Sequence, residues 1–372
     1  MPADSLRIGI VGVGGHRGSD AFTAAIEYDD LANVTAICDV DEEALTRASE
    51  HVGAEQTYVD YKEMIRRADL EAVIIATPMH LHAEQSVFAL KRGVNVLSEV
   101  PAVVSLEGAR SLVAAVKETD AQYMMLENYL FNRSNMMISR MVDAGHFGET
   151  YYGQGVTIGN LFVPRGPHTA NTWRREWIAG VNGVTYPTHT LGPLLEWMDA
   201  RVDRISCMGS GHHYEDEGGR PFESEDTTLL SMQTEAGHAI EIREDYLSNR
   251  PGGRRYELQG TKGCFESTPA STDGGRVWME SICEDLNTWK SLSSLEEEFL
   301  PEEWRNPPMP VANGERGDDF FATRAFLESV STGESVPVGV HRALDMTLPG
   351  VLSVESIEAD GAWVTVPDSR DW

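Results

Sequence analysis

The sequence predicts a protein of mixed α/β and α+β class, in which a doubly wound parallel sheet precedes an open, largely antiparallel sheet. Short apolar segments alternate with amphipathic segments as far as residue 126, which is typical of βα units. A glycine-rich turn follows the first apolar segment, and from residue 128 onward strand-like segments recur between polar or Gly/Pro-rich connections. We therefore expect two domains, over residues 1–127 and 128–372.

The turn after the first predicted strand has the composition of a dinucleotide site. Gly12 lets the chain turn sharply, and Gly14 lets the backbone approach a pyrophosphate at the N-terminus of the following helix. The third glycine of G-x-G-x-x-G is displaced, because Arg17 occupies its position and Gly18 comes one residue later. A tight turn without a ligand is the alternative. The expected contacts of the cofactor are Gly12, Gly14, Gly15, His16 and Arg17.

An acidic residue ends the second predicted strand, Asn33 to Cys38. Asp39 lies somewhat further from the glycines than the roughly 20 residues usual for a carboxylate that binds the adenosine ribose. A carboxylate there would repel a 2′-phosphate, so we expect NAD rather than NADP. Asp39 is also suited to cap the helix that begins at Glu42, and the two roles are compatible.

Other candidates follow the later strands, Glu71 to Thr77, Asn95 to Ser98 and Gln122 to Leu126. Ligands of doubly wound sheets bind at the carboxyl ends of the strands, where these segments end. His80 and His82 have a metal-like spacing, but we expect them to shape the cofactor loop, and we expect no metal. The residues expected to line this crevice are Thr77, Pro78, His80, His82, Glu99, Asn128 and Tyr129.

Composition limits the partners. The net charge is −29, from 59 acidic and 30 basic residues, which argues against nucleic acid and anionic membranes as partners. Only five basic residues are Lys, and the acidic excess is spread along the chain. This pattern predicts a halophilic protein that loses stability in low salt, with an ordinary acidic enzyme as the alternative.

The sequence also predicts a cytoplasmic location. Four cysteines lie far apart with no C-x-x-C pair, as expected for a reduced compartment. The N-terminus shows no basic stretch followed by an apolar one, and no apolar segment reaches the roughly 18 residues of a membrane span.

Two groups in the second domain are candidates for substrate chemistry. Tyr186 lies three residues before His189 at the start of a predicted helix, so the two side chains are expected to share one face. A histidine is suited to take the hydroxyl proton when hydride leaves a carbinol carbon. Trp173 offers a flat apolar surface and Arg174 offers donors to sugar hydroxyls. The alternative for His189 is a structural side chain at the start of a helix. The alternative for Trp173 and Arg174 is a packed interdomain loop. The expected substrate contacts are Trp173, Arg174, Tyr186 and His189.

These residues resemble the Gfo/Idh/MocA family, named for glucose–fructose oxidoreductase and inositol dehydrogenase, over nearly the whole chain. The motifs that carry the resemblance are Gly12-Val13-Gly14, Asp39, Thr77-Pro78 with His80 and His82, Glu99-Val100-Pro101, and Gly145 to Glu149. The resemblance implies a Rossmann domain that binds NAD, tightly in some branches, and an open-sheet domain that binds a small sugar or polyol. It also implies a homo-dimer or homo-tetramer assembled through the C-terminal sheet.

Within that family the chain resembles a branch that includes glycoside hydrolase family 109. The shared segments are Glu99 to Ala102, Met125 to Asn128, and Tyr186 to Pro193. Val100 stands where typical dehydrogenases of the family carry a Lys, and a valine cannot transfer a proton. The resemblance implies that Tyr186 and His189 handle protons, with Glu99 and Tyr129 lining the site. The candidate catalytic residues are thus His189, Tyr186, Glu99 and Tyr129.

Three functions are compatible with these residues. We favour an NAD-dependent oxidoreductase that transfers hydride between nicotinamide and a hydroxyl carbon of a sugar, glycoside or polyol. The first alternative is a glycoside hydrolase or lyase that retains NAD and works through a 3-keto intermediate by oxidation, elimination, addition and reduction. The second is a non-catalytic sugar or NAD sensor, against which the intact Tyr186 and His189 pair argues. Free NADH in proportion to product would distinguish the first function.

Overall fold

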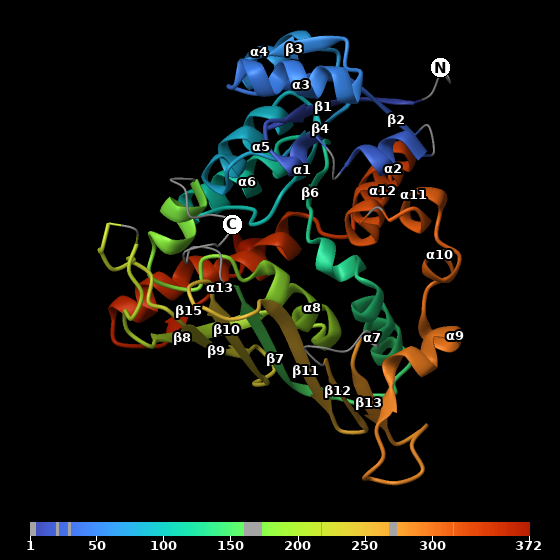
Figure 1. Ribbon diagram of the computed structural model, residues 1–372, viewed down its shortest axis with the longest axis vertical. Helices are drawn as coiled ribbons and strands as arrows, with labels where there is room; N and C mark the ends of the chain where they lie inside the picture. Colours follow the sequence, from blue (N-terminus) through green and yellow to red (C-terminus); the bar gives the residue numbers. More distant parts are fainter. Residues whose placement is uncertain are drawn as a thin grey trace. The chain divides into compact units, whose positions relative to one another are not determined.

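The computed structural model describes residues 5–19, 22–28, 31–159, 173–216, 218–267, 274–314 and 316–372 (Figure 1). Its internal contacts divide the chain into two compact units. The first unit comprises Met1–Phe131, Pro307–Leu344 and Asp368–Trp372. The second comprises Asn132–Asn306 and Asp345–Pro367. No helix among the described residues is both long enough and apolar enough to cross a membrane.

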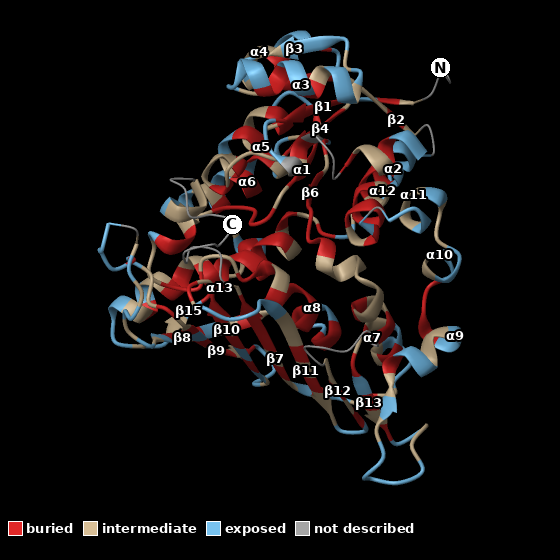
Figure 2. Ribbon diagram, viewed as in Figure 1, coloured by how far each residue is buried: buried red, intermediate tan, exposed pale blue. Residues whose placement is uncertain are grey.

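The first unit is built on a six-stranded parallel sheet in the order β3-β2-β1-β4-β5-β6. Its strands are β1 Leu6–Val11, β2 Ala32–Cys38, β3 Gln56–Tyr58, β4 Ala72–Ile75, β5 Asn95–Ser98 and β6 Tyr123–Met125. All four residues of β4 are buried, because both faces of the sheet are covered (Figure 2). The strand order reverses between β1 and β4, where doubly wound folds bind their ligands. The predicted fold class of this part is confirmed.

The helices of this part are mostly those that the sequence predicts. They are α1 His16–Ser19, α2 Thr23–Tyr28, α3 Glu42–Val52, α4 Tyr61–Arg67, η1 Met79–Leu81, α5 His82–Leu90, α6 Leu106–Lys117 and η2 Asn128–Phe131. After the glycine turn, a short helix, α1, begins at His16, and α2 then begins at Thr23.

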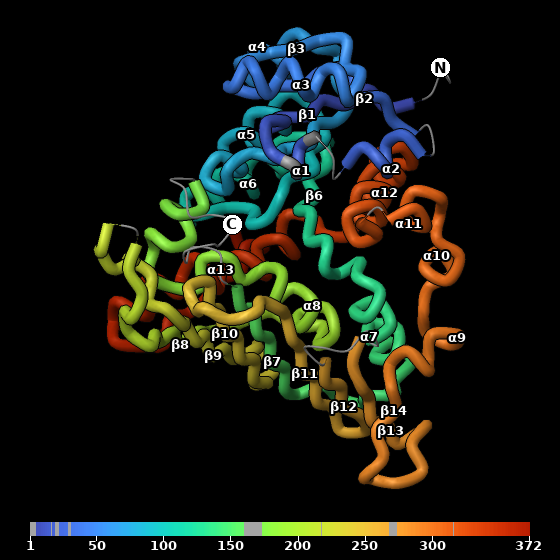
Figure 3. Tube along the Cα trace, in the orientation of Figure 1, coloured from blue at the N-terminus to red at the C-terminus, as the bar shows by residue number. Residues whose placement is uncertain are grey.

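A late segment of the chain returns to the first unit. This segment contains α11 Met309–Ala312 and α12 Gly317–Thr332, and a final turn, η5 Ser369–Asp371, follows at the end of the chain. Helix α12 packs against α2 and η2. Figure 3 shows the blue α2 beside the orange α12. Phe320 of α12 is buried and meets Tyr28 edge to face. The contacts therefore group these residues with the first unit, unlike the expected division into 1–127 and 128–372.

The second unit contains a nine-stranded sheet in the order β14-β13-β12-β11-β7-β10-β9-β8-β15. Its strands are β7 Thr150–Ile158, β8 Val202–Gly209, β9 Thr228–Thr234, β10 Ala239–Asp245, β11 Gly253–Gly260, β12 Gly263–Glu266, β13 Arg276–Met279, β14 Lys290–Ser291 and β15 Val364–Thr365. In the part of the sheet that the structure describes, the paired strands run antiparallel except for β7 and β10, which are parallel. The predicted open, largely antiparallel sheet is confirmed.

Helix α8 Thr188–Met198 packs on one face of this sheet, against β7, β10 and β11, and the second unit contains further helices besides it. They are α7 Arg133–Asp143, the π-helical turn η3 Arg175–Ala179, η4 Leu292–Leu295, α9 Glu296–Phe299 and α10 Glu302–Arg305, and α13 Val340–Glu358 continues into this unit. Gly153 and Gly155 of β7 let α8 lie close to the sheet. A side chain at Gly155 would overlap the Thr190 methyl group, and one at Gly153 would come within 3.2 Å of Leu194. The start of α8 is thereby fixed over β7.

Candidate active site

The glycine-rich turn has room for a ligand where the sequence predicts one. Gly12 adopts a φ of +94°, and a Cβ there would lie 2.7 Å from the Ala76 carbonyl group. A Cβ at Gly14 would lie 2.9 Å from the Asp39 carboxylate, whereas one at Gly15 would meet no atom within 4 Å. The backbone of this turn is therefore open on the side of Gly15. These residues fit a pyrophosphate group. The side chain of His16 lies outside the described residues.

Gly18 performs the task of the displaced third glycine. A side chain at Gly18 would overlap the carbonyl oxygen of Gly12, so only glycine allows α1 to pack this closely on the turn. The Gly18 amide also donates to the Gly15 carbonyl at 3.1 Å. The sequence shows a glycine one position later than usual. It does not show that this glycine still packs against the Gly12 carbonyl group, which only the structure reveals.

Asp39 lies at the carboxyl end of β2 and faces the turn. Its Oδ2 accepts the Gly14 amide at 2.6 Å, and its Oδ1 accepts the Asp41 amide at 2.9 Å. The N-cap of α3 is Asp41, whose side chain accepts the amides of Glu43 and Ala44, so the expected capping role of Asp39 is wrong. Asp39 thus holds the glycine turn.

Arg17 is held between two carboxylates. Its Nε lies 2.6 Å from Oε1 of Glu99, and its Nη1 and Nη2 lie 2.7 and 3.0 Å from the two oxygens of Asp319. Burial lowers the pKa of the Arg17 guanidinium, but Glu99 and Asp319 more than offset this effect, so its pKa is raised and it remains charged. The Arg17 side chain therefore ties the glycine turn to Glu99, the residue after β5.

Asp319 was not a candidate from the sequence, yet it is the centre of this ion-pair network. It is fully buried on α12, forms an ion pair with Arg316 at 3.0 Å, and accepts a hydrogen bond from the side-chain amide of Asn128 at 2.8 Å. Asn128 donates to the neighbouring Asp318 at 3.1 Å as well. Two predicted cofactor residues, Arg17 and Asn128, are therefore positioned by one aspartate that lies far along the chain.

His82 holds together the two loops that follow β4 and β5. It is 1% exposed, and its ring nitrogens lie 2.8 Å from the Thr77 carbonyl and 2.9 Å from the Pro101 carbonyl. Burial lowers the pKa of this imidazole. Because both ring nitrogens are engaged, His82 shapes the cofactor loop, as expected. Pro78 and His80 lie at η1 in the same loop, and the Thr77 hydroxyl donates to Gln85 at 2.6 Å.

Tyr129 lies in η2, directly after the last strand of the parallel sheet. Its backbone amide donates to Oε1 of Glu127 at 3.2 Å, and Glu127 is fully buried. Asn128 and Tyr129 are therefore presented by one short turn. All expected cofactor residues whose side chains are described, together with Glu99 and Tyr129, belong to the first unit.

Tyr186 and His189 meet in the second unit. Their ring centroids are 5.3 Å apart with an interplanar angle of 72°, an edge-to-face contact. Helix α8 begins at Thr188 after Pro187, so Tyr186 precedes the helix rather than lying on its first turn. Both side chains are half-buried and remain accessible. The structure thus brings the two expected proton-transfer groups together.

Polar contacts to the sheet hold the start of α8. The Tyr256 hydroxyl donates to the His189 carbonyl at 2.6 Å, and the hydroxyls of Thr190 and Thr157 are 2.6 Å apart. Arg254 donates to the Thr157 hydroxyl at 3.1 Å. The sequence did not indicate these supports, because they come from strands whose pairing only the fold defines.

Trp173 and Arg174 form a stacked pair, with the Arg174 guanidinium 4.3 Å from the Trp173 ring centroid. Trp173 lines an open cavity of about 530 Å³ together with Arg175, Asp216 and Phe222. Among the described residues, the lining of this cavity includes neither Tyr186 nor His189. The structure therefore does not join the two groups of expected substrate contacts in one cavity.

Two family models match consecutive parts of the chain. Residues 6–127 match the oxidoreductase family with an NAD-binding Rossmann fold. Residues 131–371 match the C-terminal domain of glycosyl hydrolase 109. A glycosyl hydrolase family 109 protein of Saccharopolyspora erythraea is 29% identical and covers 98% of this chain and 83% of its own length. A glycosyl hydrolase family 109 protein of Streptomyces niveus is 30% identical, and the match covers 98% of this chain and 77% of that protein.

Solved structures share the fold at lower identity. A levoglucosan dehydrogenase in complex with NADH and L-sorbose has a TM-score of 0.83 at 21% identity, and the match covers 98% of this chain and 100% of that one. An oxidoreductase domain protein from Kribbella flavida has a TM-score of 0.84 at 18% identity. That match covers 98% of this chain and 99% of the Kribbella flavida chain. These structures show the same two-part architecture.

Proposed function

Because the chain belongs to the glycosyl hydrolase 109 family and begins with an NAD-binding Rossmann domain, we propose that it cleaves glycosides and returns the hydride to the sugar in each turnover. One observation carries this proposal. The part of the chain that contains Tyr186 and His189 matches a glycosyl hydrolase domain over residues 131–371. Bound NAD would supply reversible oxidation of a hydroxyl carbon of the sugar.

The first unit supplies the cofactor site in this proposal. The amides of the open glycine turn, around Gly15, would bind the pyrophosphate of NAD, and Asp39 would accept hydrogen bonds from the ribose hydroxyls. From the described residues, each Asp39 oxygen accepts one hydrogen bond, so lone pairs remain for those hydroxyls. The negative charge of Asp39 disfavours the 2′-phosphate of NADP, so we propose NAD as the cofactor.

The second unit supplies proton transfer. His189 takes the proton of the sugar hydroxyl as that carbon is oxidised, and Tyr186, in edge-to-face contact with it, is the second proton-transfer group. Oxidation at C3 would make the C2 proton acidic, so Tyr186 would take that proton while the group at C1 leaves by elimination. Water would then add across the C1–C2 double bond, with its hydroxyl going to C1 and a proton returning to C2. Return of the hydride to C3 and of the proton from His189 to the oxygen would restore the hydroxyl.

The surroundings of Glu99 favour proton transfer by Tyr186 and His189 rather than by Glu99. Its carboxylate is paired with Arg17, which suits a positioning role better than that of a free base. Val100 next to it is 2% exposed and has no group that transfers a proton. Among the residues after β5, therefore, none takes the place of the lysine typical of dehydrogenases, and the proton chemistry is assigned to Tyr186 and His189.

A second candidate is a sugar dehydrogenase that releases NADH. The observation that favours it is the similarity in fold to levoglucosan dehydrogenase structures solved with NADH and with sugar ligands. In that reaction His189 would still take the hydroxyl proton, but no glycosidic bond would break.

The test uses chromogenic aryl α- and β-glycosides with the purified protein in deuterated water. We expect release of the phenol without net NADH, and deuterium at C2 of the product sugar. Ordinary hydrolysis would leave C2 unlabelled, and a dehydrogenase would accumulate NADH with no phenol. The His189→Ala variant should lose turnover by roughly 10²- to 10⁴-fold while it still binds NAD, because general acid–base catalysis contributes about that much.

We also propose a homo-dimer or homo-tetramer assembled through the outer face of the C-terminal sheet. Met208 of β8 and Leu229 of β9 are cross-strand neighbours, and they are 57% and 42% exposed. Sedimentation velocity tests this assembly, and a monomer at micromolar concentration would contradict it.

A further inference from the structure

A polar row crosses the helix-covered face of the second sheet beneath the start of α8. Strand pairing aligns Thr228 of β9, Glu244 of β10, Thr157 of β7 and Arg254 of β11. Glu244 is only 3% exposed. The Tyr186 amide and the Tyr246 hydroxyl both donate toward its carboxyl group. A buried acid therefore lies directly behind the segment that carries the candidate proton-transfer pair.

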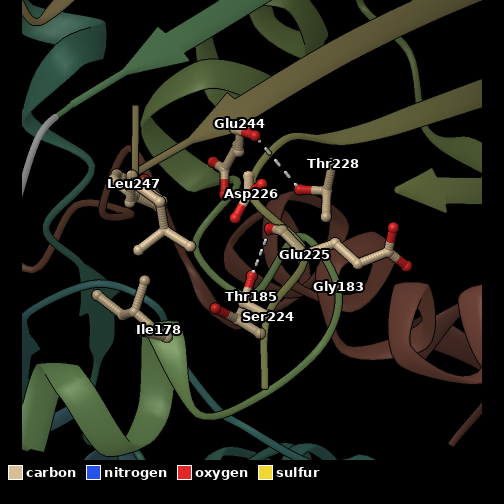
Figure 4. A pocket seen from close by; sticks show the side chains of 11 residues that line it. Ile178, Gly183, Thr185, Ser224, Glu225, Asp226, Thr228, Glu244 and Leu247 are labelled. Carbon is tan, nitrogen blue, oxygen red and sulfur yellow. Dashed lines mark hydrogen bonds between the residues drawn. The ribbon is translucent and has the colours of Figure 1, made fainter. Parts of the chain in front are cut away.

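Glu244 and a second acid line a small enclosed cavity. In the part of the chain that the structure describes, Oε1 of Glu244 and Oδ1 of Asp226 are buried without a hydrogen-bond partner, and both residues line this cavity (Figure 4). Its volume of about 10 Å³ is room for the centre of one water molecule. Two orphaned carboxyl oxygens around a space for one water indicate a bridging water.

Asp226 connects this cavity with an exposed histidine, His213. Its Oδ2 lies 2.6 Å from Nδ1 of His213 and also accepts the His213 backbone amide at 2.6 Å. The His213 side chain is 68% exposed, while that of Asp226 is 6% exposed. An imidazole at this place contacts the buried carboxyl on one side and solvent on the other.

We propose that Glu244 stores a proton for the candidate active site and exchanges it with solvent through one water molecule, Asp226 and His213. The Glu244 O–H bond breaks, the water passes a proton to the Asp226 carboxyl, and His213 takes it at Nδ1 while releasing one from Nε2. The return path reverses these steps, so no electrons are transferred and no co-reactant is consumed. The link to catalysis rests on the proposed function of Tyr186 and His189.

The electrostatic surroundings suit a proton store. Burial raises the pKa of Glu244 to about 8, although Arg254, the Tyr186 amide and the Tyr246 hydroxyl all lower it. At neutral pH the carboxyl is therefore mostly protonated, and a modest change in its surroundings releases the proton. The titratable or charged groups near it are Cys207 of β8, Glu225 and Asp226 before β9, Tyr246 after β10 and Arg254 of β11.

The test follows the carbonyl stretch of the protonated carboxyl by infrared spectroscopy of the full chain. We expect Glu244→Gln to remove a band that titrates near pH 8, and Glu241→Gln, on the exposed face of the same strand, to leave it. After transfer to deuterated water, His213→Ala should slow the exchange of this band by roughly tenfold or more, and added imidazole should restore it. The exposed neighbour His212→Ala is the matched control.

Two results would overturn the proposal. One is the absence of a protonated carboxyl band that depends on Glu244 at pH 7. The other is equal exchange in the wild type, His213→Ala and Asp226→Asn proteins. Because the infrared readout needs no substrate, a protein that shows the expected exchange but cleaves no glycoside would contradict only the proposed function.

Discussion

In the first unit the buried carboxylate of Asp319 meets the guanidinium of Arg17, whereas in the second unit the buried carboxyl of Glu244 keeps a proton instead. Both side chains are almost completely removed from solvent. An ion pair fixes geometry and resists changes in pH, while a neutral acid tolerates a dry site but responds to pH. In the first unit, paired charges therefore hold the residues around the glycine turn, whereas in the second unit hydrogen bonds surround a neutral acid behind Tyr186.

The largest expected effect is the pH dependence of stability that Glu244 imposes. Its folded-state pKa of about 8 lies above the usual 4.5, so the native state holds the proton between these values and stability falls as pH rises through that window. The loss across this window is about 5 kcal/mol, at about 1.36 kcal/mol for each pH unit. Urea unfolding of wild type and Glu244→Gln measures it, and the difference between the two proteins should grow from pH 5 to pH 9. Parallel pH profiles would show that Glu244 is ionised in the native state.

The next effect concerns the paired charges. Among the described residues, Arg17→Ala leaves the buried Asp319 with Arg316 as its one counter-charge, so the free energy of unfolding should fall by about 3 kcal/mol. Arg316→Ala is the matched control, since Arg316 is 48% exposed and its loss should cost about 1 kcal/mol or less. Chemical denaturation of the two variants tests the comparison. Equal losses would mean that Arg17 does not hold Asp319.

The smallest effect is on cofactor choice. Asp39→Ser keeps a hydrogen-bonding group at the end of β2 but removes the negative charge that faces the turn. The ratio of the NADP and NAD dissociation constants should then fall by roughly tenfold, equivalent to about 1.4 kcal/mol. Fluorescence titration with both dinucleotides measures this ratio. An unchanged ratio would leave the preference for NAD without its proposed cause.

The comparison also shows what the sequence alone could predict. The glycine turn, Asp39 and the pair of Tyr186 and His189 are local signals, because their spacing along the chain determines their geometry. The contact between Arg17 and Asp319 joins residues 302 positions apart, and nothing near Asp319 marks it as part of a site. Strand alternation cannot show that β10 lies beside β7 in parallel, so the position of Glu244 below Tyr186 emerges only from the sheet topology.

The most direct measurement of the central claim counts turnovers against cofactor. Protein purified without added cofactor is separated from small molecules, supplied with a glycoside, and then denatured so that the released dinucleotide can be identified and quantified. We predict close to one NAD for each chain and far more cleaved glycoside than dinucleotide. Product limited to the amount of bound NAD, with NADH formed in equal quantity, would contradict a hydride that returns to the sugar.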